Sequence, residues 1–233
     1  SFSKALERTA DSKNAASIPD CPPEALNAAR PFADMLHIAE ELAQALQEQR
    51  LVHGAVIIER PDPQVVLHGQ GAEVLVDIEP GSSCPRMQLV VSEIMILANS
   101  GMAEWAKTNS VPLLHRTQDV TVPREYSGVW SRPQDIARVV KVLSPAILEV
   151  SPRPHAGIGV PCYCPITSPL RRYTDLLNEA QILSCLSGNG PRWSAEELNN
   201  LLPLLNARLD AAGQMQRFRP RYWKLLFFKQ QGD

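Results

Sequence analysis

The segment from Tyr163 to Asp175 (YCPITSPLRRYTD) places two arginines, two hydroxyl groups and a carboxylate within thirteen residues. Ser168 is a suitable helix N-cap. Pro169 fits the first helical position, because the N–H that proline lacks would have no partner there. The pattern predicts a helix that opens at Ser168-Pro169 and continues to about Ser187. Free backbone N–H groups at its start, together with hydroxyls and guanidinium groups, would bind a phosphate.

Arg171 and Arg172 would lie in the first turn of this helix, where the dipole disfavours a cation by roughly 0.3–1 kcal/mol. A bound anion would offset that cost, and the hydroxyls of Thr167 and Ser168 would add hydrogen bonds to it. Asp175 follows the two arginines by four and three residues, so it could orient either one. A second interpretation stays open, since arginines on helices commonly face solvent or pair with a carboxylate.

Hydrophobic periodicity predicts the helices that would position this segment. They are expected over 22–50, 85–109 and 133–143. A terminal helical section begins at Ser194, where Glu197 completes a capping box. Pro203 and Pro220 should break or kink that section. Within 85–109, three polar residues lie off the apolar stripe, which on pattern alone places them on a solvated face: Glu93, Asn99 and Glu104.

Short β-branched segments predict the strands. AVIIERP and QVVLHGQG should form a hairpin across Pro61-Asp62-Pro63, and EVLVDI at 73–78 would add a third strand. The ranges 112–118, 147–150 and 157–163 also favour extended structure. Helices alternating with strands predict the α/β (α+β) class.

Composition narrows the classes of function. With 44% hydrophobic residues and a formal net charge of −2, the chain of 233 residues is neither intrinsically disordered nor basic overall. No apolar run approaches the length of roughly 18 residues that a membrane span requires. The five cysteines form no CxxC pair, so Cys162 and Cys164 are interpreted as structural thiols in a reducing, cytoplasmic setting.

The sequence TSPLRRYTD resembles the TSPIRRYxD signature of the RNB catalytic domain of ribonuclease II and ribonuclease R, which are processive 3′-to-5′ exoribonucleases. Four further segments resemble blocks of that family and occur in the family's order: RLVHGAV at 50–56, VSEIMILAN at 91–99, LHRTQ at 114–118 and HAGIGV at 155–160. The resemblance covers about Arg50 to Ser187.

The resemblance implies an RNB-like mixed sheet surrounded by helices, present as a partial catalytic domain. Residues 1–21 would be a frayed or truncated lead-in and residues 22–233 the C-terminal part of the domain, with 194–233 as the terminal helical section.

The resemblance also implies roles for single residues. Arg171 matches the arginine that contacts the scissile phosphate and stabilises its developing charge. Arg172, Thr167 and Ser168 would position the RNA backbone. Residues expected to line or support the RNA channel are Glu93, Tyr163, Asn99, Arg116 and His155. For the last three, a structural role that satisfies backbone groups stays equally open.

The chain also departs from the family pattern. RNB enzymes hold Mg²⁺ with clustered aspartates in a DxxxxxDxDD-like motif, and no such cluster occurs in these 233 residues. The resemblance therefore implies Mg²⁺ for the intact enzyme, with ligands outside this chain, and assigns no metal ligand within it. Gln118 replaces a family histidine, and Glu179 stands where a basic residue is expected.

The stretch 211–232 carries basic residues interleaved with aromatic ones and contains no Asp or Glu. This composition suits single-stranded nucleic acid. The favoured alternative is a terminal helix whose aromatic side chains dock into the core, because Trp223, Leu226 and Phe227 have helical spacing.

These observations predict part of a 3′-to-5′ exoribonuclease that hydrolyses single-stranded RNA to nucleoside 5′-monophosphates. Its expected partners are single-stranded RNA and a preceding RNB segment carrying the aspartates, with no membrane. The alternative is a non-catalytic single-stranded RNA-binding module derived from the same fold, and a structural or regulatory domain is the third interpretation.

Overall fold

The structure is a computed structural model that describes residues 28–59, 63–69, 71, 74–79, 85–118 and 122–232. Its helices are η1 (Arg30–Phe32), α3 (Ala33–Val52), α4 (Pro85–Thr108), η3 (Arg124–Tyr126), α5 (Pro133–Val142), α6 (Tyr173–Leu186) and α7 (Ala195–Gln231). Its strands are β1 (Val56–Ile58), β2 (Gln64–His68), β3 (Leu75–Glu79), β4 (His115–Thr117), β5 (Gly128–Trp130) and β6 (Ile147–Glu149). The predicted lead-in, residues 1–21, lies outside the described residues.

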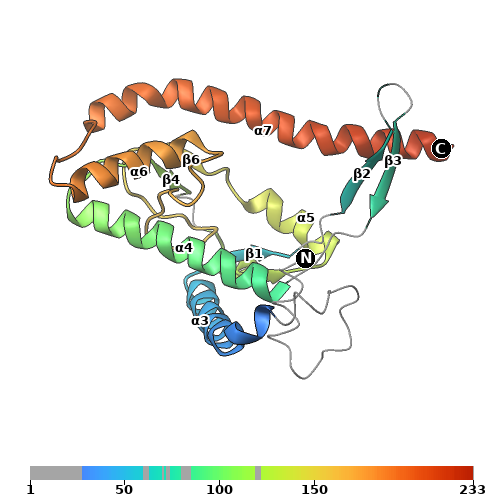
Figure 1. Cartoon of the computed structure of the whole chain (residues 1–233), viewed down its shortest axis with the longest axis horizontal. Helices are drawn as coiled ribbons and strands as arrows, with labels where there is room; N and C mark the ends of the chain where they lie inside the picture. The colour runs from blue at the N-terminus through green and yellow to red at the C-terminus, as the bar shows by residue number, and fades with distance from the viewer. Residues whose placement is uncertain are drawn as a thin grey trace.

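Helix α4 confirms the helix that the hydrophobic periodicity predicts over 85–109. It lies between α3 and α6 (Figure 1). Near its start it packs against α3 through a cluster formed by Ala43, Met87 and Val90. Near its end, Ala103 and Ala106 form a second cluster with Leu113, Cys162, Cys164 and Ile182. Because α4 joins both clusters, it connects α3 to the segment that leads into α6.

The two thiols of Cys162 and Cys164 are fully buried in this second cluster. Burial raises the pKa of the Cys162 thiol to about 11 and that of Cys164 to about 12. Both groups therefore stay protonated at neutral pH and pack as small apolar side chains. This is the structural role predicted for them.

The mixed α/β class is confirmed, and the strands of the described residues pair two by two. Strands β1 and β5 are parallel, whereas β2–β3 and β4–β6 are antiparallel. The predicted hairpin between β1 and the next strand is wrong, because distant segments use the backbone groups beside β1. Val56 N donates to the Gly157 carbonyl, and Gly128 N donates to that of Ala55.

The hairpin of the structure joins β2 and β3, and Gly69 and Gly71 lie at its turn with positive φ angles of 87° and 67°. Glycine adopts this conformation without the cost that a Cβ imposes. The range 157–163, predicted to be extended, forms turns with isolated bridges between His155 and Gln118 and between His155 and Val160.

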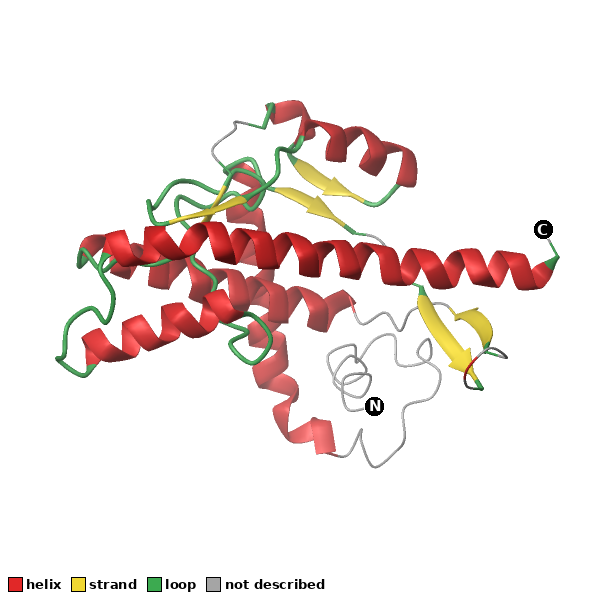
Figure 2. Cartoon of the chain, turned by 90° about the horizontal axis from the view of Figure 1, so that it is seen from above, coloured by secondary structure: helices red, strands yellow, loops and turns green. Residues whose placement is uncertain are grey.

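Helix α7 runs along one side of the molecule, from the region of α6 to the β2–β3 hairpin, as Figures 1 and 2 show. The predicted capping box is present, since Ser194 Oγ accepts from Glu197 N and the Glu197 carboxylate accepts from Ser194 N. The predicted break at the prolines is wrong, because the helix continues through Pro203 and Pro220. Packing holds α7 through Leu198 before Pro203, through Leu205 between the two prolines, and through the β2–β3 hairpin towards its C-terminal end.

Within the described ranges, no helix combines the length and apolar character that crossing a membrane requires.

Candidate functional site

The segment TSPLRRYTD forms a turn followed by a helix. Helix α6 begins at Tyr173, so the prediction that it opens at Ser168 is wrong. The Ser168 carbonyl accepts from Arg171 N at 3.2 Å and from Arg172 N at 3.0 Å, which closes a tight turn before the helix. Both arginines therefore precede α6 and lie outside its first turn.

Asp175 explains why the chain turns at this place. Its carboxylate, which is fully buried, accepts from Ser168 N at 2.9 Å and so fixes the start of the turn. The same Oδ1 accepts from Arg172 Nε at 3.1 Å and from Arg172 Nη2 at 2.7 Å. Asp175 thus orients Arg172 and the backbone of Ser168 together, and the open choice between the two arginines is resolved in favour of Arg172.

Arg171 is exposed, and its Nη2 lies 3.5 Å from the Ser168 hydroxyl, to which it donates a long hydrogen bond. Within the described part of the chain no carboxylate pairs with it. Its guanidinium group is therefore free to receive an anion, while the neighbouring guanidinium of Arg172 is held by Asp175.

Asn99 connects helix α4 to the residues before the turn. It is fully buried, and its side chain accepts from Ile166 N at 3.0 Å and donates to the Tyr163 hydroxyl at 2.7 Å and to Thr167 Oγ1 at 3.4 Å. The solvated position that the pattern gave Asn99 is wrong. Its hydrogen bonds fix the backbone on which the two arginines are mounted, as a buried polar side chain requires.

His155, Arg116 and Tyr163 lie together on the other side of this network. The rings of His155 and Tyr163 meet edge to face with centroids 5.9 Å apart, and Arg116 N donates to the Tyr163 carbonyl at 2.9 Å. Burial, with Arg116 nearby, lowers the pKa of His155 to about 4, so the imidazole is neutral at pH 7. The Arg116 side chain is exposed, and His155 Nδ1 has no partner among the described residues.

Glu93 is separate from this group. It lies on α4 and is only 2% exposed, because its carboxylate forms an ion pair with Arg50 of α3. Arg50 Nη1 also donates to the Ile158 carbonyl at 2.6 Å. The solvated position predicted for Glu93 is wrong.

A pocket of about 570 Å³ opens beside the Glu93–Arg50 pair, lined by residues of α3, α4 and the loop 154–161. Gly159 shapes its wall. This glycine has a φ of 76°, and a Cβ on it would lie 2.6 Å from the Arg50 carbonyl oxygen. Only glycine therefore allows the loop to pass so close to the end of α3.

The structure thus brings together eight of the nine predicted site residues around the start of α6, by contact or by adjacency in the chain: Asn99, Arg116, His155, Tyr163, Thr167, Ser168, Arg171 and Arg172. Glu93 lies about 1.7 helical turns before Asn99 on α4, beside the pocket.

Two buried polar residues, for which the sequence pattern predicted no role, hold α6 in place next to this site. Asn178 accepts from Leu114 N at 2.8 Å and donates to the carbonyls of Leu114 and Pro165. Gln181 bonds the carbonyl of Pro112 and both backbone groups of Trp193. Their signal was present in the sequence, because both fall on the buried stripe of the helix among Leu177 and Ile182.

The donor set does not suit a metal ion. No group of three or more His, Cys, Asp or Glu side chains that could hold one occurs among residues 28–59, 63–69, 71, 74–79, 85–118 and 122–232. The buried carboxylates of the region, Glu93 and Asp175, are each engaged by an arginine. Among the described residues, the exposed guanidinium group of Arg171 is chemically suited to an anion, and no group of carboxylates is arranged to hold Mg²⁺.

Known proteins resemble the chain in sequence. It is 25% identical over 197 residues to an uncharacterized ribonuclease of Synechocystis sp., covering 83% of this chain and 29% of that protein. It is 27% identical over 205 residues to the chloroplastic/mitochondrial ribonuclease II of Arabidopsis thaliana, covering 84% of this chain and 25% of the relative. The chain thus spans less than a third of the length of these curated relatives.

The fold is that of solved exoribonucleases. The structure of an active-site mutant of the Dss1 exoribonuclease from Candida glabrata matches 97% of this chain and 31% of its own length, with a TM-score of 0.79 and 23% identity. Mycoplasma genitalium RNase R in complex with ribose-methylated single-stranded RNA matches 97% of this chain and 40% of its own, with a TM-score of 0.69 and 17% identity. The family model of the RNB domain matches residues 1–188, and the chain belongs to that family.

Proposed function

We propose that this chain is part of a 3′-to-5′ exoribonuclease that hydrolyses single-stranded RNA to nucleoside 5′-monophosphates, and that it supplies the arginine side of the active site. The observation that carries the proposal is the contrast between two adjacent guanidinium groups. Asp175 holds Arg172, whereas Arg171 is exposed and pairs with no carboxylate in the described part of the chain. The names of the relatives, which include ribonuclease II and RNase R, support this reading.

In the proposed reaction, a water molecule supplies a hydroxyl group to the phosphorus and a proton to the departing O3′, as the P–O3′ bond breaks. The phosphate therefore stays on the 5′ carbon of the released nucleotide. Arg171 contacts the scissile phosphate, where negative charge grows in the transition state. Thr167, Ser168 and Arg172 position the RNA backbone, because the turn and Asp175 hold these groups in one place.

Tyr163, Asn99, Arg116 and His155 form the supporting wall in this proposal. Asn99 and the Tyr163 hydroxyl fix the chain that carries the arginines. Glu93 would act from the pocket side of the channel, through its ion pair with Arg50.

Magnesium belongs to the proposal as well. Carboxylates of a preceding RNB segment would hold it, since the described residues of this chain provide no ligand set. When bound, the ion would supply charge stabilisation and an activated water at the phosphate. A cytoplasmic location is likewise proposed, from the unpaired thiols of Cys162, Cys164 and Cys185.

The test is single-turnover degradation of an end-labelled oligoadenylate by the intact protein with Mg²⁺. We expect Arg171→Ala to lower the rate about 10²- to 10³-fold, as the loss of one preorganised donor does elsewhere, while RNA binding persists. Arg171→Lys should recover only part of the rate, because a lysine keeps the charge but lacks the planar fork.

The matched control is Arg138→Ala, which removes an exposed arginine from α5 and should leave the rate unchanged. A rate unchanged in Arg171→Ala would refute the role of this arginine. RNA binding with no degradation under any metal condition would identify the protein as the non-catalytic RNA-binding module.

A further inference from the structure

The C-terminal half of α7 differs in charge from the rest of the molecule. Residues 211–232 contain no Asp or Glu, whereas the whole chain carries a formal net charge of −2. Their basic side chains are those of Arg217, Arg219, Arg221, Lys224 and Lys229. This half of the helix therefore carries a positive charge, whereas the net charge of the whole chain is slightly negative.

One side of this half-helix is packed against the β2–β3 hairpin. Gln230 accepts from Val76 N at 2.9 Å and donates to the Val74 carbonyl at 2.7 Å, and Trp223 and Phe227 are half-buried. The prediction that the aromatic side chains dock into the fold is confirmed for these two.

The same prediction is wrong for the aromatic side chains on the other side. Phe218 is 62% exposed, Tyr222 59% and Phe228 53%. Arg217 and Arg221 are exposed beside them. At about 100° per residue, Arg217, Phe218, Arg221, Tyr222 and Leu225 share one surface, which is called the α7 outer face below.

The spacing on this face repeats along the helix. Arg217 and Arg221 are four residues apart, and so are Phe218 and Tyr222, which places each pair about 6 Å apart along the axis. A guanidinium group thus lies beside an aromatic ring in each of two successive turns. Such an arrangement offers one contact to a phosphate and one stacking surface to a base in each turn.

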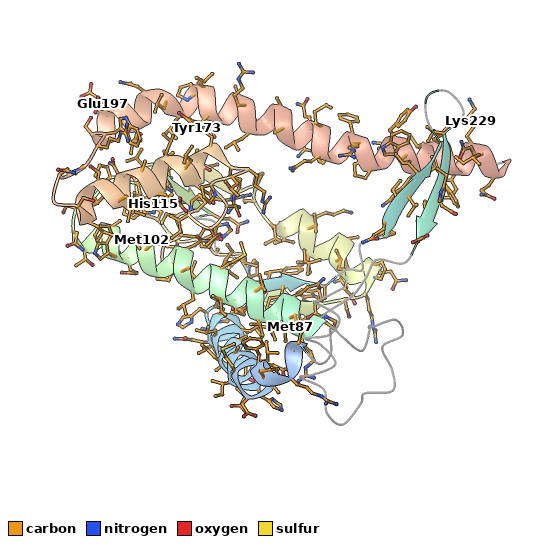
Figure 3. All side chains as sticks on the ribbon, in the orientation of Figure 1. Met87, Met102, His115, Tyr173, Glu197 and Lys229 are labelled. Atoms are coloured by element: carbon orange, nitrogen blue, oxygen red, sulfur yellow. The ribbon has the colours of Figure 1, made fainter. Side chains whose placement is uncertain are left out.

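The position of α7 relates this face to the arginine turn. Leu205 of α7 packs in one cluster with Leu177 of α6, which follows the turn by only a few residues. Arg217 lies twelve residues further along the continuous helix, or about 18 Å. Figure 3 shows the helix continuing past this point to Lys229 beside the hairpin.

We propose that the α7 outer face is a second binding surface for the same single-stranded RNA, away from the nucleotide that is cleaved. Arg217 and Arg221 bind phosphates, and bases stack on Phe218 and Tyr222. RNA is the occupant that the charges favour, because a region without a single acidic residue complements a polyanion. The inference rests on the proposed function, since it concerns the same RNA.

The test is fluorescence anisotropy with the full chain and labelled oligoadenylates of about 4 and about 16 nucleotides, the range of site sizes known for single-strand binding folds. We expect R217Q/R221Q to weaken binding of the longer RNA and to lower the slope of log K against log salt by about 1.4, or 0.7 for each phosphate contact. F218A/Y222A should raise the Kd for the longer RNA by about 30-fold or more without changing that slope, because each of two stacked bases contributes about 1–3 kcal/mol.

The matched control is R208Q/R219Q, because both arginines are exposed on α7 but lie on the side opposite to Arg217. This variant removes the same charge from the same helix and should leave the slope and the Kd unchanged. The shorter RNA can occupy only one of the two surfaces at a time, so the outer-face variants should weaken its binding less than they weaken binding of the longer RNA. Circular dichroism checks that each variant is folded.

The outcomes separate this inference from the proposed function. If Arg171→Ala lowers the degradation rate as expected while both outer-face variants bind the longer RNA as tightly as the wild type, the inference is wrong and the proposed function stands. If the wild-type chain binds neither RNA, both are contradicted. If F218A/Y222A leaves RNA binding intact but converts a dimer to a monomer in light scattering, the face is a protein interface and the inference is overturned.

Discussion

The arginine turn at 168–172 and the α7 outer face both present guanidinium groups, but the fold holds them in different ways. At the turn, buried polar side chains from two helices converge: Asp175 of α6 fixes Ser168 and Arg172, and Asn99 of α4 fixes Ile166. On α7, Arg217 and Arg221 pair with no carboxylate among the described residues, and only the helical backbone sets their spacing.

This difference in how the arginines are held matches the two roles proposed for them, catalysis at the turn and RNA binding on α7. In the proposed function Arg171 stabilises a transition state. Its own side chain is exposed, but Asp175 and Asn99 fix the backbone that carries it, which limits the reorganisation that the reaction would require. A surface that holds the remainder of a polymer needs only charge and aromatic area, and it tolerates side-chain motion. Stability measurements test this contrast between the arginine turn and the α7 outer face.

The largest effect is expected for Asp175→Ala. The substitution leaves Arg172 and Ser168 N without their acceptor in a largely buried place, and we expect the free energy of unfolding to fall by about 3–5 kcal/mol. Urea denaturation measures it, with Asp175→Asn as a milder variant. The control is Asp210→Ala on the exposed surface of α7, which should change the free energy by about 0.5 kcal/mol at most. Equal effects of the two substitutions would abolish the contrast.

The second-largest effect is expected from acid, which should lower the free energy of unfolding through two buried histidines near the arginine turn. Burial lowers the pKa of His115 and of His155 from 6.5 to about 4, so below pH 6.5 the unfolded chain binds protons that the folded chain does not. The free energy of unfolding should therefore be highest above pH 6.5. It should fall by about 2–3 kcal/mol per histidine as the pH drops to 4.5.

Denaturation curves of His155→Gln measured between pH 6.5 and 4.5 test this dependence, because the variant should lose about one histidine's share of the decline. His68→Gln, which replaces an exposed histidine on β2, is the control and should keep the full decline. Helix α7 contains no histidine. A decline that is equally steep in His155→Gln would show that the imidazole is accessible to protons in the folded state.

The smallest effect is expected on the outer face itself. F218A/Y222A and R217Q/R221Q should change the free energy of unfolding by about 0.5 kcal/mol or less, because the side chains are exposed. Urea denaturation of the same preparations used for RNA binding checks this. A loss of several kcal/mol would show that the side chains of the α7 outer face are packed. The outer face would then not differ from the arginine turn in its contribution to stability.

Much of the framework could be predicted from local pattern. The helix over 85–108 follows from its apolar stripe, and the capping box at Ser194 follows from two residues three apart. Strand pairing could not be predicted in the same way. The partner of β1 is β5, about 70 residues further along the chain, and neither the Pro-Asp-Pro sequence nor the β-branched residues of β1 indicate it.

The candidate site likewise has features that local sequence predicts and features that depend on packing between distant segments. The sequence alone determined which residues could bind a phosphate, because the spacing of Ser168, Arg171, Arg172 and Asp175 is local and the chemistry of each group is fixed. Only the tertiary structure decided which arginine is free, since Asp175 can reach both along the chain and buries its charge against one. It also decided that Asn99 is an internal anchor and that three of the five aromatic side chains of α7 are exposed. Burial is a property of the neighbours that the fold brings from distant segments, and no local spacing contains it.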